Sequence, residues 1–396
     1  MAFFKNVKPA PADPILDLTR AFAADKRENK VNLGVGAYKT IDLEPLILSS
    51  VKKAEALLLE RETSKDYLPI EGFKKYLQAS KELIFGSSVS SDHVVSVQSV
   101  GGTGALRVGA IFLKQQGCST VSISVPTWGN HPRIFKQAGF EVKTHSYLDV
   151  KGLCFDFESF SNEIQNLPPK TVLLLQPSCH NPTGFDPTFE QWQEICKWVR
   201  AKELFVFFDL AYQGFGEDLE KDVSVIRYFG QQEGLQFAVA VSYSKNFGLY
   251  AERTGALFFV VNDSEKVDPI LSNLKEIIRG IYSNPPCHGA RIVNLILENP
   301  ELKEHWVHEL ITMRDRISEM RKALMAELQS KVTKHSFEFL AHQKGMFSYL
   351  GLNGNQVDQL IAEYGIYMTR DSRINVAGLN TENIGYVAEA IAAVIE

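Results

Sequence analysis

Short apolar runs alternate with amphipathic stretches through the middle of the sequence, and this alternation restricts the fold more than any other feature. Six runs are rich in β-branched or aromatic residues, as expected of strands that are covered on both faces. These runs are residues 94–97, 121–125, 172–175, 204–208, 237–241 and 256–261. Amphipathic stretches such as 104–115 and 189–202 lie between several of them. The pattern predicts an α/β fold with a mostly parallel central sheet and helices on both faces.

After residue 300 the pattern changes to that of one long helix. Apolar residues there form a single stripe at spacings of three and four: Leu310, Met313, Ile317, Met320, Leu324 and Leu328. A helix over about 301–330 follows, with weaker strands at 337–340 and 346–350 and a last helix near 381–395. Because 396 residues exceed one ordinary core, we expect two domains. A large domain takes residues 46–310, and a smaller α+β domain takes 1–45 and 311–396, with the long helix joining them.

Composition argues against several classes of protein. The net charge is −5 and both signs are mixed along the chain, so neither nucleic acid nor a membrane surface is an expected partner. No apolar run reaches the ~18 residues of a membrane span, and the N-terminus lacks a leader pattern, so a cytoplasmic protein is expected. The five cysteines are scattered without a Cys-x-x-Cys pair, which favours reduced thiols. His305 and His308 lack a third ligand, so no metal is expected.

Polar and glycine residues follow three of the expected strands where each strand ends. The first run leads into a turn with Gly102 and Thr103, the fourth is followed by Asp209, and the fifth by Ser242 and Lys245. Ligands of parallel α/β sheets bind outside the carboxyl ends of the strands, so we expect these residues to converge. A glycine turn at a helix start suits a phosphate.

Each of these features alone has an ordinary explanation. The glycine turn alone suits a plain tight turn. It is no dinucleotide fingerprint, because Arg107 stands at the third glycine position, and a second Gly-x-Gly fails likewise at Lys39. Asp209 alone suits a helix N-cap, and Lys245 alone suits an exposed surface lysine. Together, a lysine amine, a carboxylate and a phosphate cup are the recurring parts of a pyridoxal-phosphate site.

Nine segments extend this interpretation, because they occur in the order and close to the spacing of a known family. They are residues 32–38, 67–72, 101–104, 126–131, 180–184, 208–215, 242–250, 282–286 and 372–376. Together they resemble the class I, fold-type-I family of pyridoxal-phosphate-dependent aminotransferases, in particular its aspartate aminotransferase subgroup. The resemblance covers nearly the whole chain. It is less specific for the substrate, because aromatic aminotransferases share most of these segments.

The resemblance implies roles for five residues around the cofactor ring. Lys245 resembles the lysine that holds the cofactor as a Schiff base and moves a proton at the substrate's Cα. Asp209 is similar to the acid that pairs with the ring nitrogen and makes the ring an electron sink. Tyr212 and Asn181 resemble the two donors to the phenolic oxygen, and Trp128 resembles the aromatic side chain that stacks on the ring.

The resemblance also implies a phosphate cup and a supporting residue. The cup residues are Gly101, Gly102, Thr103, Ser242 and Arg253. His131 resembles the partner of Asp209 on the side away from the cofactor, and Tyr67 would reach the phosphate from a neighbouring subunit.

The resemblance implies substrate recognition for a second set of residues, which overlaps the cofactor-binding set. It consists of Gly36, Trp128, Asn181, Arg279 and Arg373. Arg373 resembles the residue that binds the α-carboxylate as a bidentate pair, and Arg279 the residue that reaches across a dimer to the distal carboxylate. A buried guanidinium favours a second carboxylate over an apolar side chain, which would leave its charge unpaired. The expected assembly is a homodimer with shared active sites.

The expected reaction is transamination in two half-reactions, from aspartate and 2-oxoglutarate to oxaloacetate and glutamate. An aromatic or broad-specificity aminotransferase on the same scaffold is the nearest alternative. A non-catalytic regulator module that binds pyridoxal phosphate is a second one, although the chain leaves no room for a DNA-binding domain before Asn32. A dehydrogenase is disfavoured by the two broken glycine patterns.

Overall fold

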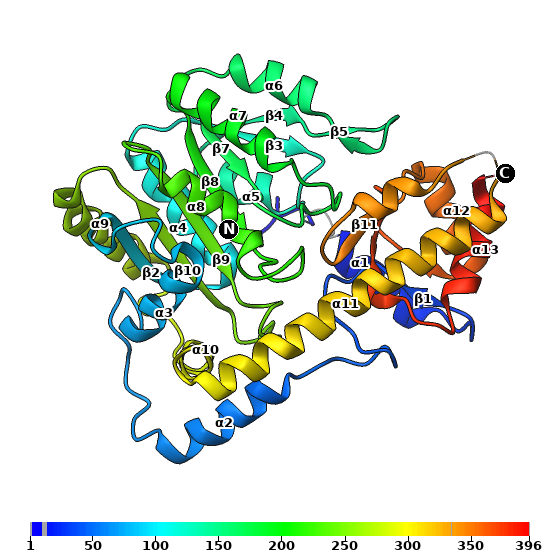
Figure 1. Ribbon diagram of the computed structural model, residues 1–396, viewed down its shortest axis with the longest axis horizontal. Coiled ribbons are helices and arrows are strands. Elements are labelled where there is room, and N and C mark those ends of the chain that lie inside the picture. The colour runs from blue at the N-terminus through cyan, green and yellow to red at the C-terminus, as the bar shows by residue number, and fades with distance from the viewer. Residues whose placement is uncertain (1, 10–13, 334, 396) are drawn as a thin grey trace.

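The computed structural model describes residues 2–9, 14–333 and 335–395, and its centre is a seven-stranded sheet (Figure 1). The strand order is β2-β10-β9-β8-β7-β3-β4. β10 runs antiparallel to both of its neighbours, and the other pairs are parallel. The bounds are β2 Val94–Val100, β3 Thr120–Val125, β4 Glu141–Ser146, β7 Val172–Leu175, β8 Phe205–Leu210, β9 Phe237–Ser242 and β10 Thr254–Val260. The predicted α/β fold with a mostly parallel sheet is confirmed.

Helices cover both faces of this sheet because successive strand side chains enter two different apolar cores. In β8, Val206 and Phe208 pack into one core and Phe207 into the other. Helices α4, α5 and α9 contribute to the core that contains Phe207, and α3, α6, α7 and α8 to the opposite one. The bounds are α3 Lys74–Phe85, α4 Gly101–Gln115, α5 His131–Gln137, α6 Phe157–Gln165, α7 Phe189–Ala201, α8 Ser224–Gly230 and α9 Val267–Ile281.

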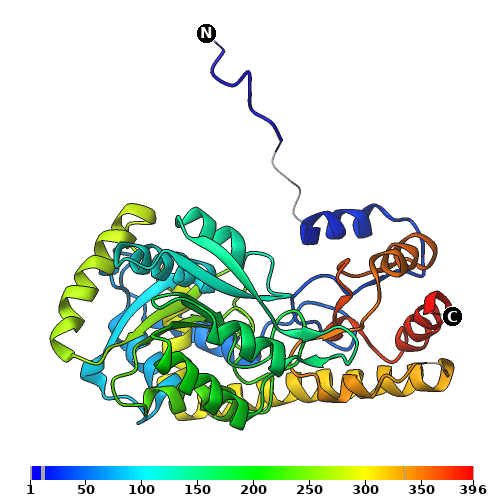
Figure 2. The ribbon, with the colours of Figure 1, turned by 90° about the horizontal axis from the view of Figure 1, so that it is seen from above.

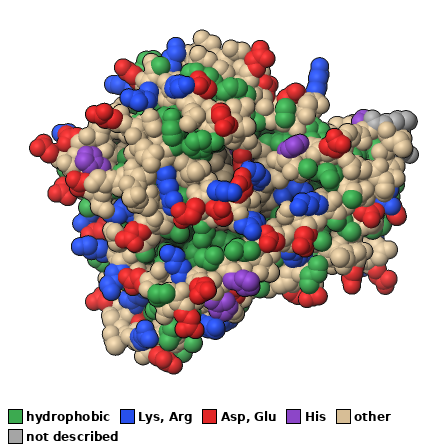
Figure 3. Space-filling view, viewed as in Figure 1, with side chains coloured by type: hydrophobic (Ala, Val, Ile, Leu, Met, Phe, Trp, Pro, Cys, Tyr) green, Lys and Arg blue, Asp and Glu red, His purple; other side chains and the backbone are tan. Residues whose placement is uncertain are grey.

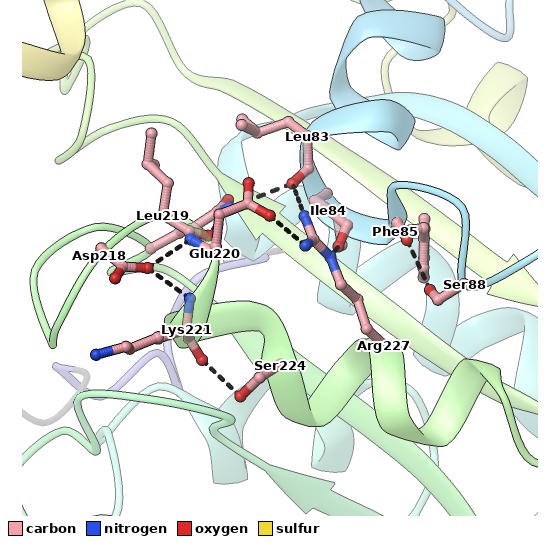
Figure 4. A network of polar contacts seen from close by, with 11 residues as sticks. Leu83, Ile84, Phe85, Ser88, Asp218, Leu219, Glu220, Lys221, Ser224 and Arg227 are labelled. Carbon is pink, nitrogen blue, oxygen red and sulfur yellow. Dashed lines mark hydrogen bonds and ion pairs between the residues drawn. The ribbon is translucent and has the colours of Figure 1, made fainter.

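Helix α3 is held against α8 by Arg227, whose guanidinium reaches the last carbonyls of α3 (Figure 4). Its Nε donates to the Ile84 carbonyl at 2.9 Å and its Nη2 to the Leu83 carbonyl at 3.2 Å, while Nη1 pairs with Glu220. The last carbonyls of a helix lack partners within the helix and carry its negative dipole end. A cation there satisfies both, and it fixes the two helices on one face of the sheet.

The long helix α11 (Pro300–Lys331) leads from the sheet to the C-terminal part of the chain (Figure 1). Asn299 caps its start by accepting from the backbone N–H of Leu302, and Pro300 occupies the first turn. The predicted apolar stripe is buried along its length. At its start α11 packs on α2 (Ser49–Arg61) and α10 (His288–Glu298), and it also contacts α13 (Ile384–Ile395).

The first and last parts of the chain come together beside α11. β1 (Val31–Asn32) pairs in parallel with β12 (Ile366–Tyr367), and β11 (Phe347–Tyr349) pairs antiparallel with β13 (Arg373–Asn375). The remaining helices are α1 Pro14–Ala24 and α12 Gly354–Tyr364, and β5 Leu148–Asp149 pairs with β6 Cys154–Phe155. The short 3₁₀ helices are η1 Ser91–His93, η2 Lys221–Val223, η3 Ser264–Lys266, η4 Glu338–His342 and η5 Val376–Gly378.

Two details differ from the sequence-based assignment. The strand expected at 337–340 is wrong, because η4 occupies most of that stretch. Edge strand β4 was not expected, because half of its side chains are exposed and it contains no apolar run. An edge strand with one poorly covered face carries little hydrophobic signal.

The surface shows mixed charge and one extended end. Acidic and basic side chains are interspersed on the face seen in Figure 3, without a stripe of one sign. Residues 2–9 reach away from the body of the molecule (Figure 2), and their side chains include the exposed Phe3 and Phe4. Within the described ranges, no helix has both the length and the apolar character needed to cross a bilayer.

Candidate active site

The structure brings residues from several strand ends into one cavity of about 260 Å³. β2, β7, β8 and β9 end at this edge of the sheet, and β10 begins there because it runs the other way. Residues from all five elements or the turns next to them line the cavity, as expected for a parallel sheet. The lining residues are Ile15, Gly36, Gly102, Thr103, Trp128, Gln176, Asn181, Asp209, Ala211, Tyr212, Ser242, Ser244, Lys245, Tyr250, Arg253, Phe347 and Arg373.

One end of the cavity is a cradle for an anion. Helix α4 begins at Gly101 without a side-chain cap, so its first turn offers backbone N–H groups and a positive dipole end. A Cβ on Gly102 would lie 3.1 Å from the Cβ of Ser242, so glycine keeps this space open. Arg253 lies beside the turn, and its Nη1 donates to Ser244 Oγ at 3.2 Å. Helix N–H groups, hydroxyls and a guanidinium together match the requirements of a phosphate.

A lysine amine lies at the centre of the cavity. The Nζ of Lys245 is 4.7 Å from the centre of the Tyr212 ring. Burial lowers the pKa of Lys245 from 10.5 to about 8; Asp209 partly opposes this shift and Arg253 adds to it. The side chain remains partly exposed to the cavity. The amine is therefore accessible, and it is neutral far more often near neutral pH than an ordinary lysine, as a nucleophile requires.

The turn that carries Lys245 is fixed from behind by helix α11. The Phe247 ring stacks on Trp306, with ring centres 4.3 Å apart. The indole Nε1 of Trp306 donates to the carbonyl of Asn246 at 2.7 Å. Both groups are buried, so this contact holds the backbone next to Lys245 in one place.

A carboxylate lies in the same cavity, held by a buried imidazole. Asp209 Oδ2 is 2.9 Å from Nε2 of His131, and Nδ1 of His131 is 2.8 Å from Thr127 Oγ1. His131 is fully buried, and the Trp128 ring meets it edge-on at 5.2 Å. These contacts fix the orientation of Asp209, and its side chain lines the cavity.

A buried guanidinium also lines the cavity. Arg373 Nη2 donates to the Gly34 carbonyl at 2.7 Å, and its Nη1 lies 3.4 Å from Asn181 Oδ1. The guanidinium carbon lies 4.2 Å from the centre of the Phe347 ring. Its Nε is buried without a hydrogen-bond partner, and no carboxylate of the described chain forms an ion pair with it. A buried cation with an open donor is suited to an incoming carboxylate.

These groups fit pyridoxal phosphate. The glycine-lined cradle takes a phosphate, Asp209 suits a protonated ring nitrogen, and Lys245 suits an aldehyde carbon. Burial raises the pKa of Tyr212, so its phenol stays a hydrogen-bond donor. When bound, the cofactor supplies an aldehyde that carries an amino group and a ring that withdraws electrons from the substrate's Cα.

Not every residue implied by the resemblance lines the cavity of this chain. His131 lies behind Asp209 and Gly101 lies against Arg253 rather than in the lining. Tyr67 is 86% exposed, and Arg279 is also exposed. Arg279 Nη1 contacts Ser283 Oγ at 2.5 Å. The segments that carry Tyr67 and Arg279 are neighbours, because the side chain of residue 284 donates to the carbonyl of residue 68 at 2.7 Å.

The sequence analysis did not single out several lining residues. Gln176, Ser244, Tyr250 and Phe347 all line the cavity. Ser244 and Tyr250 lie within one of the recognised segments. Gln176 directly follows β7. Examining the residue after this strand, as was done for the other strands, would have identified Gln176. Phe347 lies in a strand that was expected, but nothing in its local pattern distinguishes it from an ordinary core residue.

Comparison with known proteins agrees with this geometry. Residues 28–391 match the model of the family described as aminotransferase class I and II. The chain is 43% identical to a mitochondrial aspartate aminotransferase of Xenopus tropicalis, over 98% of this chain and 92% of that one. It is 44% identical to an aspartate aminotransferase of Escherichia coli K12, over 99% of this chain and 100% of that one.

A solved structure extends the similarity to the fold and the cofactor. It is an aromatic-amino-acid aminotransferase from Burkholderia pseudomallei, covalently bound to pyridoxal phosphate. The two chains are 43% identical, each is covered completely, and the TM-score is 0.97. From the sequence, the cavity and these relatives together, the chain belongs to the aminotransferase class I and II family and is a pyridoxal-phosphate-dependent aminotransferase that acts on amino acids and 2-oxo acids.

Proposed function

We propose that this enzyme transfers the amino group of aspartate to 2-oxoglutarate, giving oxaloacetate and glutamate. One observation carries the proposal: a partly neutral lysine amine and a fixed carboxylate line the same cavity as a buried arginine that has no anionic partner in the described chain. The two relatives of 43% and 44% identity named above are aspartate aminotransferases. They support the choice of amino donor.

Four residues would hold and tune the cofactor in this proposal. Lys245 holds it through its amine and afterwards takes the proton from the substrate's Cα. The carboxylate of Asp209 keeps the ring nitrogen protonated, and the Tyr212 phenol and the Asn181 amide donate to the ring oxygen. The support is that all four line one cavity, whose anion cradle fixes where the phosphate lies.

Two groups would bind the substrate's ends. Arg373 takes the α-carboxylate with its open donors, and Trp128 and Gly36 bound the space beside it. The distal carboxylate needs a second cation. We assign this role to Arg279 of a second copy of the chain, because in this copy Arg279 lies exposed and outside the cavity.

A homodimer with shared sites is therefore part of the proposal. The exposed aromatic rings of Tyr67 (86%), Phe3 (88%) and Phe4 (83%) support it, because aromatic side chains are enriched in protein interfaces. We expect sedimentation at micromolar concentration to give a dimer. A chain that is fully active while strictly monomeric would contradict the assignment of Tyr67 and Arg279.

Substrate preference tests the proposal directly. With 2-oxoglutarate as acceptor, we expect kcat/KM for aspartate to exceed that for phenylalanine by about 100-fold or more, because a ring would leave the distal guanidinium unpaired. The measurement is the initial rate of 2-oxo acid formation for each donor. Equal values, or a preference for phenylalanine, would refute aspartate as the main donor.

A specific observation favours the aromatic alternative as a second candidate. A chamber of about 530 Å³ adjoins the cavity and shares Trp128, Asn181 and Arg373 with it. Such a volume has room for an aromatic side chain, and one similar structure is an aromatic-amino-acid aminotransferase. The same comparison of aspartate and phenylalanine decides between the two.

The division into domains also stays a proposal. Residues 46–310 would form the cofactor-binding domain, and residues 1–45 with 311–396 a small domain that moves Arg373 toward the substrate. The two-stranded sheet of β11 and β13, which is separate from the central sheet, supports this division. A cytoplasmic location stays a prediction.

A further inference from the structure

Gln176 makes two hydrogen bonds with the backbone of one residue that lines the cavity. Its Oε1 accepts from the backbone N–H of Asn181 at 3.0 Å, and its Nε2 donates to the carbonyl of the same residue at 3.2 Å. Both residues are buried, with 7% and 5% of their surface exposed. One planar amide thus satisfies both backbone groups of a single residue on the wall of the cavity.

The loop that carries Asn181 is held from two sides. Behind it, Asp186 accepts from the backbone N–H groups of Cys179 and His180 at 2.7 and 2.9 Å. Gln176 holds it on the side that lines the cavity. Asp186 does not bind the backbone of Asn181 itself, so Gln176 determines where that residue lies.

The position of Asn181 matters because its side chain faces Arg373. Asn181 Oδ1 lies 3.4 Å from Nη1 of Arg373, whose Nε is buried without a partner. Among the described residues, Asn181 therefore orients the guanidinium together with the Gly34 carbonyl and the Phe347 ring. A shift of Asn181 would misdirect the donors that a carboxylate needs.

We propose that Gln176 is a positioning residue for carboxylate binding: its side-chain amide fixes the backbone of Asn181, and Asn181 in turn orients Arg373. This inference rests on the proposed role of Arg373 and adds a residue to it. The glutamine amide supplies a donor and an acceptor in one plane at this position, at any pH. A glutamate would place a second acceptor against the Asn181 carbonyl, and a leucine would leave both backbone groups unsatisfied.

The test compares Gln176→Leu and Gln176→Glu with the unaltered holoenzyme, using succinate as a non-reacting dicarboxylate. We expect the Kd of succinate, measured by calorimetry at pH 8, to rise about 10-fold in both variants, the effect of one ordinary hydrogen bond. KM for aspartate should rise with it, while kcat changes less. The Kd of pyridoxal phosphate for the apo-protein, measured by fluorescence quenching, should change less than that of succinate.

The pH dependence of the succinate Kd below pH 8 distinguishes a positioning role from a merely structural one. A protonated glutamate regains the donor that the carboxylate lacks, so the succinate Kd of Gln176→Glu should approach the unaltered value as pH falls from 8 to 5.5. The Gln176→Leu variant should show no such recovery, since it has no titratable group there.

Gln356 provides a control, because its side-chain amide also binds two backbone groups. Its Oε1 accepts from the Asn353 N–H at 2.9 Å, and its Nε2 donates to the Val394 carbonyl at 3.0 Å. It lines neither the cavity nor the adjoining chamber. Gln356→Leu should lower the melting temperature and leave the succinate Kd within about twofold.

Equal rises of Kd in Gln356→Leu and Gln176→Leu, or no rise in either Gln176 variant, would overturn the inference. A holoenzyme that fails to bind succinate before any substitution would instead refute the proposed function, so the two failures are distinguishable.

Discussion

Replacing Lys245 by alanine is expected to abolish steady-state transamination, lowering kcat by about 10⁴-fold, the upper end of what a positioned acid–base group contributes. The reason is that this lysine supplies the cavity's nucleophilic amine, with its Nζ 4.7 Å from the Tyr212 ring centre and its pKa lowered to about 8. The variant also loses the covalent attachment of the cofactor. The measurement is the rate of oxaloacetate formation from aspartate and 2-oxoglutarate.

Lys197→Ala is a suitable control, because Lys197 is an exposed lysine on α7 that pairs with Glu194. It removes the same charge without touching the cavity and should leave kcat unchanged. If Lys245→Ala transaminates at the normal rate, the assignment of the amine is wrong.

The rate at which the unaltered apo-protein captures the cofactor, followed against pH, independently tests the pKa of Lys245. Lys245 must be neutral to attack an aldehyde, and its pKa of about 8 lies below the ordinary 10.5 because burial disfavours the charged form. The rate of cofactor capture should therefore rise with pH, reach half of its maximum near pH 8 and level off above. A half-maximum near 10.5 would mean that the amine is not desolvated.

Replacing Asp209 by asparagine is expected to produce the second largest loss, a fall in kcat of roughly 150- to 5,000-fold, since breaking a buried ion pair costs about 3–5 kcal/mol. The side chain keeps its shape and its place near His131, 2.9 Å away, but it loses the charge that stabilises a protonated ring nitrogen. Cofactor affinity should fall as well, which equilibrium dialysis measures.

The same substitution has a sign-specific effect on Lys245. Asp209 raises the pKa of Lys245 against the effect of burial, so its removal should lower that pKa and move the half-maximum of cofactor capture below pH 8. A shift above pH 8 would show that Asp209 and Lys245 do not share one environment.

Asp222→Asn is the matched control for Asp209. Asp222 is also buried, but it accepts from backbone N–H groups of residues 214, 216 and 217 and does not line the cavity. It should lower stability without moving the half-maximum of capture. A comparable loss of kcat in both variants would mean that the effect of Asp209 is structural.

The sequence predicted the sheet because its strands are buried on both faces. Continuous apolar runs such as β7 and β8 mark such strands plainly, and the stripe on α11 marks a helix equally well. The convergence of Asp209 and Lys245 followed from one rule, that parallel strands place their carboxyl ends at one edge. The structure brings both residues into one cavity, and their roles stay a prediction.

What the sequence did not predict depends on long-range packing. The polar edge strand β4 has no apolar signal, and η4 replaced an expected strand because short apolar stretches do not specify a period. The ring of Phe347 beside Arg373 joins two segments whose local patterns do not indicate that they meet. Arg279 lies outside the cavity of its own chain, and a single sequence gives no geometry for a second copy.

The parallel pairing of β1 with β12 has a consequence for how the protein is made. Val31 cannot pair until Ile366, its partner in the register, has been synthesised. At about 5–20 residues per second, the ribosome needs roughly 17 to 67 s to add the residues between them. Before that interval ends, the nascent chain already contains residues 101–253, and with them every residue of the phosphate cradle, while Arg373 has not yet been added. Synthesis thus completes the cofactor end of the cavity wall before its carboxylate-binding arginine.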